Sequence, residues 1–191
     1  YSRRRPNSSS SMITLNLLQL RYLIFGQTVG LCGIDGGMLE QATDAAAKGL
    51  IDLMHRLTNT QSGEKMRLAG WFCTHAHEDH IGSIPYCMKE VNCPIHGTAM
   101  TCGLIKLKLE EHKLLDKVKL ITHKPGESVK AGCFTVEFIH VNHSIADAVA
   151  FAIHTPVGTV VMTGDFKIDP TATDGMIDLA RFGQLGNEGV L

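Results

Sequence analysis

The alternation of apolar and polar residues separates a featureless start of the chain from a periodic remainder. Residues 1–11 (YSRRRPNSSSS) are polar and Ser-rich without an apolar repeat, so we interpret them as a disordered tail or cloning scar and place the domain at 12–191. Residues 13–17 alternate apolar and polar side chains, which predicts a strand. A second strand is predicted over 29–34, ending in a tight Asp-Gly-Gly turn at 35–37.

Helical periodicity dominates the next part of the chain. The spacing of apolar residues predicts helices over 41–57, 81–91 and 98–115, whereas 69–74 (AGWFCT) is typical of a short buried strand. In the third helix, the row expected to face the core comprises Met100, Leu104, Leu107, Glu111 and Leu115, with Lys106, Lys108 and Lys113 facing outwards.

From residue 117 onwards, β-branched and aromatic residues recur in short runs broken by Gly, Pro, Asn or Asp, which is typical of strands. The predicted strands are VKLIT (118–122), CFTVEFIHV (133–141), AVAFAIHT (148–155) and TVVMTGD (159–165). A hairpin turn is predicted at 156–158 and a helix over 175–186. This order of elements favours an α/β fold, with helices layered on sheets.

Composition narrows the class of protein. A chain of 191 residues suits one domain or part of one, and 44% hydrophobic residues provide a core, which excludes a wholly disordered chain. With 18 Lys and Arg against 19 Asp and Glu, overall charge would not drive tight binding to polyanions. The six cysteines form no C-x-x-C pair, so we expect reduced thiols and a cytoplasmic protein. The 14-residue apolar stretch over 12–25 is shorter than the ~20 residues of a membrane span.

The strongest chemical feature is the segment 75–80, His-Ala-His-Glu-Asp-His, which follows a predicted strand. It offers four potential metal ligands, and imidazole and carboxylate groups suit Zn²⁺. His143 and Asp165 stand at the ends of two further predicted strands and would complete six ligands for two ions about 3.5–4 Å apart. Such paired ions are typical of hydrolases.

The other ionisable residues have simpler interpretations. Asp35 is either a turn residue beside two glycines or an acceptor that orients a ligating imidazole, and its spacing leaves both open. Ordinary structural or surface roles are expected for His55, His96, His112, His123, His140 and His154.

The segment 75–80 resembles the H-x-H-x-D-H signature of the metallo-β-lactamase superfamily. Its Glu-Asp-His-Ile-Gly form, followed by Ser-Ile-Pro-Tyr, is similar more specifically to the ribonuclease J family. The further similar blocks are 136–139, 141–148, 152–156 and 163–167. The resemblance extends from about Asp35 to the last residue and implies an αββα sandwich, which we expect to be incomplete at the C-terminus.

The resemblance also implies roles for individual residues. It implies that one zinc ion is bound by His75, His77 and His143 and that a second is bound by Asp79 and His80. Asp165 would bridge the two ions, and Asp79 and Asp165 would be the catalytic carboxylates. Asp35 would be an acidic residue that supports the site. The implied activity is cleavage of RNA phosphodiesters, as endonuclease and 5′-to-3′ exonuclease, by a hydroxide that two zinc ions activate. RNA is thus the implied partner.

Three departures from the family pattern qualify this expectation. Residues 12–33 lack the Gly-Gly-x-x-Glu-Ile-Gly stretch, and neither the family's β-CASP insert nor its further histidine for the second zinc is present. We therefore expect the three-histidine ion to be held more firmly than its neighbour. An incomplete sandwich would also expose a sheet edge and favour homo-oligomers or poor solubility.

Two alternatives stay open at this point. The chain could be another hydrolase on the same scaffold, of the lactamase or thioesterase type, or a metal-binding domain without activity. The blocks after residue 136 favour the ribonuclease.

Overall fold

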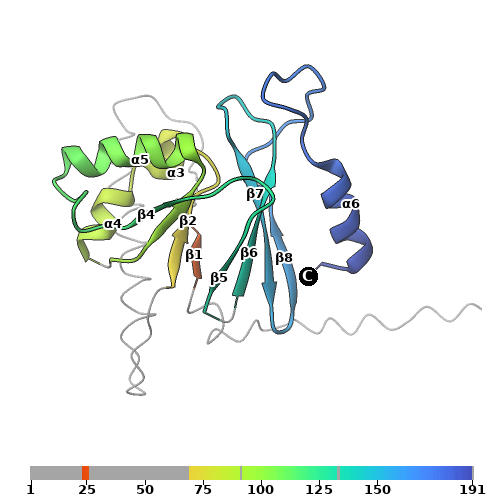
Figure 1. The fold of residues 1–191 in the computed structure, drawn as a ribbon, viewed down its shortest axis with the longest axis horizontal. Helices are drawn as coiled ribbons and strands as arrows, with labels where there is room; N and C mark the ends of the chain where they lie inside the picture. Colours follow the sequence, from red (N-terminus) through yellow and green to blue (C-terminus); the bar gives the residue numbers. More distant parts are fainter. Residues whose placement is uncertain (1–22, 26–68, 91, 133, 191) are drawn as a thin grey trace, which may run out of the picture.

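The computed structural model describes most of the chain from residue 69 onwards together with one short strand before it (Figure 1). The described ranges are 23–25, 69–90, 92–132 and 134–190. The predictions that lie outside them are the tail over 1–11, the strands over 13–17 and 29–34, the turn at 35–37 with Asp35, and the helix over 41–57.

The first half of the described structure is a four-stranded parallel sheet, in the order β1-β2-β3-β4. Its elements are β1 (Leu23–Phe25), β2 (Gly70–Phe72), α3 (Glu78–Ile81), α4 (Ile84–Glu90), β3 (Ile95–Gly97), α5 (Ala99–Glu111) and β4 (Leu120–Thr122). Parallel neighbours need crossover connections, and the helices between β2, β3 and β4 provide them. Strands β2 and β3 are buried at every position, as expected where both faces of a parallel sheet are covered.

The second half is a four-stranded antiparallel sheet, in the order β5-β6-β7-β8, followed by one helix. Its elements are β5 (Ser128–Ala131), β6 (Phe134–His140), β7 (Val149–Thr155), β8 (Gly158–Met162) and α6 (Leu179–Glu188). The hairpin predicted at 156–158 is confirmed, because β7 and β8 pair antiparallel on either side of it. Strand β8 ends this sheet and is only partly buried throughout.

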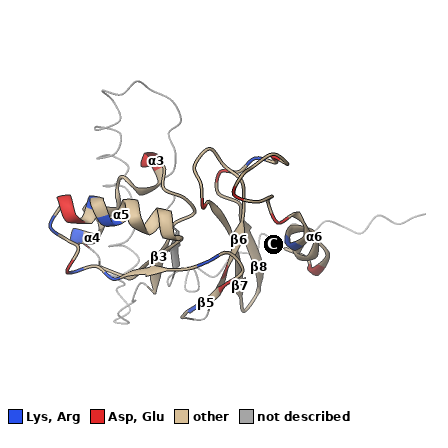
Figure 2. Cartoon of the chain, turned by 45° about the horizontal axis from the view of Figure 1, so that its top comes forward, with Lys and Arg blue, Asp and Glu red and all other residues tan. Residues whose placement is uncertain are grey.

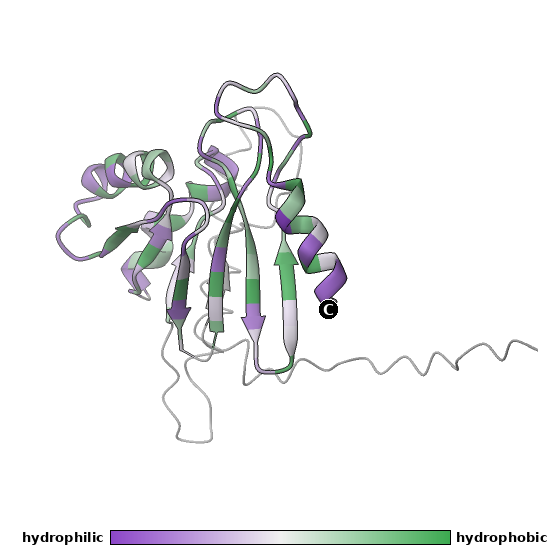
Figure 3. Ribbon diagram, turned by 45° about the vertical axis from the view of Figure 1, so that its right-hand side comes forward, coloured by the Kyte–Doolittle hydropathy of each residue, from purple (hydrophilic) through white to green (hydrophobic). Residues whose placement is uncertain are grey.

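The elements are stacked in the order helices, sheet, sheet and helix, and three apolar clusters lie between these layers. One layer lies between α3–α5 and the parallel sheet, and it includes Trp71, Ile95 and Ile105. Between the two sheets, Phe72 of β2 meets the large side chains on one face of β6 and β7. The opposite face of β7 carries Ala150, which packs with the residues of α6. Figure 3 shows α6 beside this antiparallel sheet, with apolar positions along its strands. The predicted layered α/β sandwich is thereby confirmed.

Helix α5 corrects the predicted core row. The helix ends at Glu111, and two members of the row, Met100 and Leu107, are 41% and 59% exposed. The buried positions are instead Thr101, Cys102, Ile105 and Leu109. A Cβ added to Gly97 of β3 would lie 3.3 Å from Cγ2 of Thr101 and 3.4 Å from Sγ of Cys102, so the missing side chain of Gly97 leaves room for this face of α5 against the sheet.

Further details of the structure differ from expectation. Lys108 does not simply face outwards, because its Nζ lies 2.6 Å from a carboxylate oxygen of Glu78 and ties α5 to α3. Figure 2 shows acidic positions on α3 and basic positions on α5. The helix predicted over 81–91 begins only at Ile84, as α4, because residues 82 and 83 form a turn after α3. Strands β1, β3 and β5 were not predicted, because runs of three or four residues carry too little periodicity.

Cysteines and membrane spans were the remaining structural expectations. Cys73, Cys87, Cys93 and Cys102 are free and buried, and burial raises the thiol pKa of each. Within the described ranges, no helix has both the length and the apolar character needed to cross a bilayer.

A buried histidine between the sheets gives the fold a pH dependence. The ring of His96 in β3 stacks on Phe72 with centroids 4.4 Å apart, and its Nδ1 lies 2.9 Å from Nε2 of His123. Burial, then the neighbouring His123 and Lys119, lowers the pKa of His96 to about 4. This buried, stacked position agrees with the structural role that the sequence analysis expected for His96.

We expect His96 to make the folded state less stable in acid. Its unfolded pKa is 6.5 and its folded pKa is about 4, so its neutral form is favoured by folding above pH 6.5 and this contribution is lost as pH falls towards 4. Between pH 8 and pH 5, the free energy of unfolding of the wild type should fall about 1–2 kcal/mol more than that of His96→Gln. Urea unfolding at both pH values, with a chelator present, measures the difference; equal losses in the two proteins would contradict it.

Candidate metal centre

The candidate ligands come from the ends of three strands that the fold brings together. His75 and His77 follow β2, His143 follows β6, and Asp165 follows β8. His77 has extended backbone (φ −67°, ψ 150°) just before α3 begins. Because side chains two residues apart in an extended segment share a face, His75 and His77 present their rings together. The three segments that the sequence singled out therefore meet in space.

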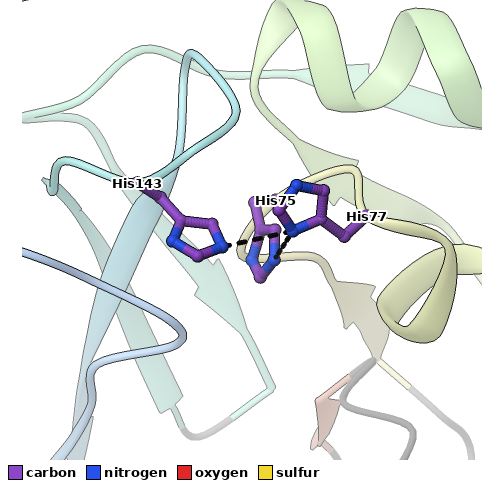
Figure 4. A group of neighbouring side chains, drawn as sticks. All are labelled: His75, His77 and His143. Atoms are coloured by element: carbon purple, nitrogen blue, oxygen red, sulfur yellow. Dashed lines mark hydrogen bonds between the residues drawn. The ribbon is translucent and has the colours of Figure 1, made fainter. Parts of the chain in front are cut away.

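Three imidazoles form the first group (Figure 4). Nδ1 of His77 lies 3.1 Å from Nε2 of His75 and 3.2 Å from Nε2 of His143. Three ring nitrogens thus converge on one point, which is the arrangement of a three-histidine metal site.

A second group shares a member with the first and contains His75, His80 and Asp165. Oδ2 of Asp165 lies 3.5 Å from Nε2 of His80, 4.0 Å from Nε2 of His75 and 3.8 Å from Nε2 of His143. The Asp165 carboxylate therefore faces both groups, where a bridging ligand would have to lie. Asp79 belongs to neither group among the described residues, although its Oδ2 lies 3.6 Å from Nε2 of His80.

The electrostatics of the cluster favour neutral imidazoles. Burial, followed by the neighbouring His80, His143 and His77, lowers the pKa of His75 to about 4. Burial and His77 likewise lower the pKa of His143, with Asp165 acting in the opposite direction. Metals bind the unprotonated ring nitrogen, so these groups are ready to act as ligands at neutral pH.

Two hydroxyl groups contact the ring nitrogens that face away from the cluster. Oγ1 of Thr74 lies 3.1 Å from Nδ1 of His75, and Oγ of Ser144 lies 3.4 Å from Nε2 of His77. Partners of this kind fix the tautomer and the orientation of ligating imidazoles. By contrast, Nδ1 of His80 is buried without a hydrogen-bond partner among the described residues. The donor set and these outer contacts fit a metal ion.

Sequence reasoning did not identify Thr74 or Ser144, although each is adjacent to a candidate ligand. Their position next to His75 and His143 was the signal in the sequence that could have identified them. Asp35, predicted to support the site, lies outside the described residues.

Asn142 joins the segments that carry His143 and Asp165. Its backbone oxygen accepts from the Lys167 N–H at 2.7 Å, which draws the chain after β8 towards His143. Its buried side chain donates to the Gly175 carbonyl at 2.6 Å and accepts from the Ile177 N–H at 2.9 Å.

Gly164 allows the segment that carries Asp165 to lie close to Thr74, next to His75. Its φ of +58° favours glycine, and an added Cβ would lie 2.9 Å from Cβ of Thr74. A larger residue here would push Asp165 away from the histidines.

A layered sandwich with histidines and an aspartate gathered at its strand ends defines a class of metalloprotein. The family model described as "Metallo-beta-lactamase superfamily" matches residues 60–184, and the chain belongs to this superfamily.

Curated relatives refine the assignment. Ribonuclease J of Helicobacter pylori is 45% identical over 131 residues, which cover 66% of this chain and 19% of the relative. Ribonuclease J of Synechocystis sp. is 46% identical over 128 residues (65% and 20%), and that of Mycolicibacterium smegmatis is 44% identical over 161 residues (82% and 28%). The chain thus spans less than a third of the length of these relatives.

The expected resemblance to ribonuclease J is confirmed by these relatives. Together with the family match, they support a metal-dependent hydrolase.

Proposed function

We propose that this chain carries the metal centre of a ribonuclease that hydrolyses RNA phosphodiester bonds with two zinc ions. The observation that carries the proposal is the meeting of three histidines and Asp165 from separate strand ends. The choice of RNA as substrate rests on the similarity to ribonuclease J.

Under this proposal, each candidate residue has one task. The first ion is held by His75, His77 and His143, the second by Asp79 and His80, and Asp165 lies between them. Zinc would polarise the phosphodiester and make water a stronger nucleophile at neutral pH. Asp79 and Asp165 supply the carboxylates of the centre.

Charge supports a phosphodiester substrate. The histidines contribute no charge when neutral, and the pKa of His75 and of His143 is lowered. The carboxylates of Asp79 and Asp165 neutralise only half of the charge of two divalent cations. The loaded site would therefore stay cationic, which favours an anionic phosphodiester over a neutral amide or thioester.

The remaining parts of the proposal rest on separate grounds. Endonuclease and 5′-to-3′ exonuclease action follow from the resemblance. A cytoplasmic location is proposed because free thiols suit a reducing compartment, and self-association is proposed through the partly buried strand β8.

The test compares three substrate classes on the full chain. End-labelled RNA, a chromogenic β-lactam and a thioester are each incubated with zinc-loaded protein, with and without a chelator. Cleavage of RNA alone, abolished by the chelator, is the expected result. Turnover of the lactam or thioester would assign the chain to another hydrolase of the superfamily, and zinc binding without any turnover would indicate an inactive metal-binding domain.

A further inference from the structure

The segment between β6 and β7 carries His143 and is held in an unusual backbone conformation. Asp147, four residues after His143, has a φ of +66°, in the left-handed region that non-glycine residues seldom occupy. Backbone hydrogen bonds close the segment, from Val141 N–H to the Ala148 carbonyl and from Val149 N–H to the Thr74 carbonyl. Such conformations persist only where surrounding contacts enforce them.

Those contacts come from the start of α5. Oδ2 of Asp147 accepts a hydrogen bond from the Met100 N–H at 3.0 Å, and its carbonyl accepts from Oγ1 of Thr98 at 2.7 Å. Thr98 is the N-cap residue of α5, yet its own side chain makes no capping hydrogen bond. A carboxylate at the N-terminus of a helix satisfies a free N–H and interacts favourably with the helix dipole. Asp147 therefore caps α5 from a distant part of the sequence.

This contact joins the two halves of the molecule next to the metal centre. Helix α5 packs on the parallel sheet whose strand β2 leads to His75, whereas His143 follows the antiparallel strand β6. The neighbouring Ile145 packs against the core beneath α5 as well. The segment that carries His143 is thus seated on the half that carries the other two histidines.

We propose that Asp147 is a positioning residue for the metal centre, which holds His143 in register with His75 and His77 by capping α5. It does not contact the candidate ligands in any hydrogen bond of the described structure, so it acts through the backbone of the 143–149 segment. The inference rests on the proposed zinc site and adds a residue outside it.

Three substitutions at residue 147 separate the cap from the backbone strain. Asp147→Asn keeps a side-chain oxygen and tolerates the left-handed conformation. Asp147→Gly removes the cap and favours that conformation, whereas Asp147→Ala removes the cap and adds strain. The matched control is Asp178→Ala, because Oδ1 of Asp178 caps α6 by accepting from the Arg181 N–H at 2.9 Å. This control removes the cap of a helix that carries none of the candidate ligands.

Zinc affinity is measured on the full chain by competition with a chromophoric chelator, and melting temperature is measured without metal. Asp147→Gly and Asp147→Ala should bind the tighter zinc ion about 10-fold more weakly, whereas Asp147→Asn should stay within about 3-fold of the wild type. Asp178→Ala should lower the melting temperature and leave zinc affinity unchanged.

Different failures are distinguishable. If Asp147→Gly lowers the melting temperature as Asp178→Ala does but binds zinc like the wild type, Asp147 is only a helix cap and the inference is wrong. The same conclusion follows if Asp147→Asn binds zinc as weakly as Asp147→Ala does. A wild type that binds no zinc would overturn the proposed function and this inference together.

Discussion

His75→Ala is expected to weaken zinc binding at the three-histidine site directly and at the second site through Asp165. His75 is a proposed ligand of the first ion, and it is also the only residue common to the two ligand groups found in the described structure, where it is fully buried and its Nε2 lies 4.0 Å from Oδ2 of Asp165. Its removal should lower zinc affinity by more than about 100-fold, beyond the 10–100-fold typical of outer contacts, and abolish RNA cleavage. Metal content after dialysis and cleavage of labelled RNA measure the two effects.

Single-site substitutions give the comparison that this prediction needs. His77→Ala removes a ligand of the first group only, and His80→Ala removes a ligand of the second group only. His112→Ala serves as the control, since this histidine lies at the end of α5 and contacts Tyr86 and Lys89 instead of the cluster. Full zinc content in His75→Ala would remove the basis of the proposed function.

The wild type should release its zinc in two steps, and the ion bound by Asp79 and His80 should leave before the ion bound by the three histidines. The first ion would have three imidazoles, whereas the second depends on His80 and on the carboxylates of Asp79 and Asp165, which are 56% and 49% exposed. A chelator titration that removes both ions with equal affinity would contradict this order.

Asn142→Ala is expected to produce the largest loss of stability outside the apolar core. The Asn142 side chain is fully buried, and its removal leaves the buried Ile177 N–H without its acceptor and takes one donor from the Gly175 carbonyl. An unpaired buried group of this kind costs about 1–3 kcal/mol in the free energy of unfolding. Urea unfolding measures the loss.

The matched control is Asn92→Ala. Nδ2 of Asn92 also donates to a backbone carbonyl, that of Lys117, at 2.7 Å, but in an exposed position. Water can replace the lost partner there, so the expected cost is within about 0.5 kcal/mol. Equal effects of the two substitutions would show that burial of Asn142 contributes nothing.

Local pattern was sufficient for much of the fold. The strands around residues 133–165 and their hairpin were predictable because runs of β-branched and aromatic residues recur there and a Pro-x-Gly turn separates the last two. In the parallel sheet, β2 and β4 were predicted from their apolar runs, whereas β1 and β3 were not, since so short a strand is defined by its pairing with residues distant in the sequence. The face of α5 was wrongly predicted for the same reason: contact with β3 decides which of its residues are buried.

The sequence by itself determined which side chains could hold metal, because ligand chemistry belongs to the residue and the segment 75–80 places several such residues together. It also determined that His143 and Asp165 stand at strand ends. Only the tertiary structure decided that Asp165 faces both ligand groups and that Asp147 caps α5. Those relations join residues far apart in the chain, and their distances are set by the packing of two sheets, which no local pattern records.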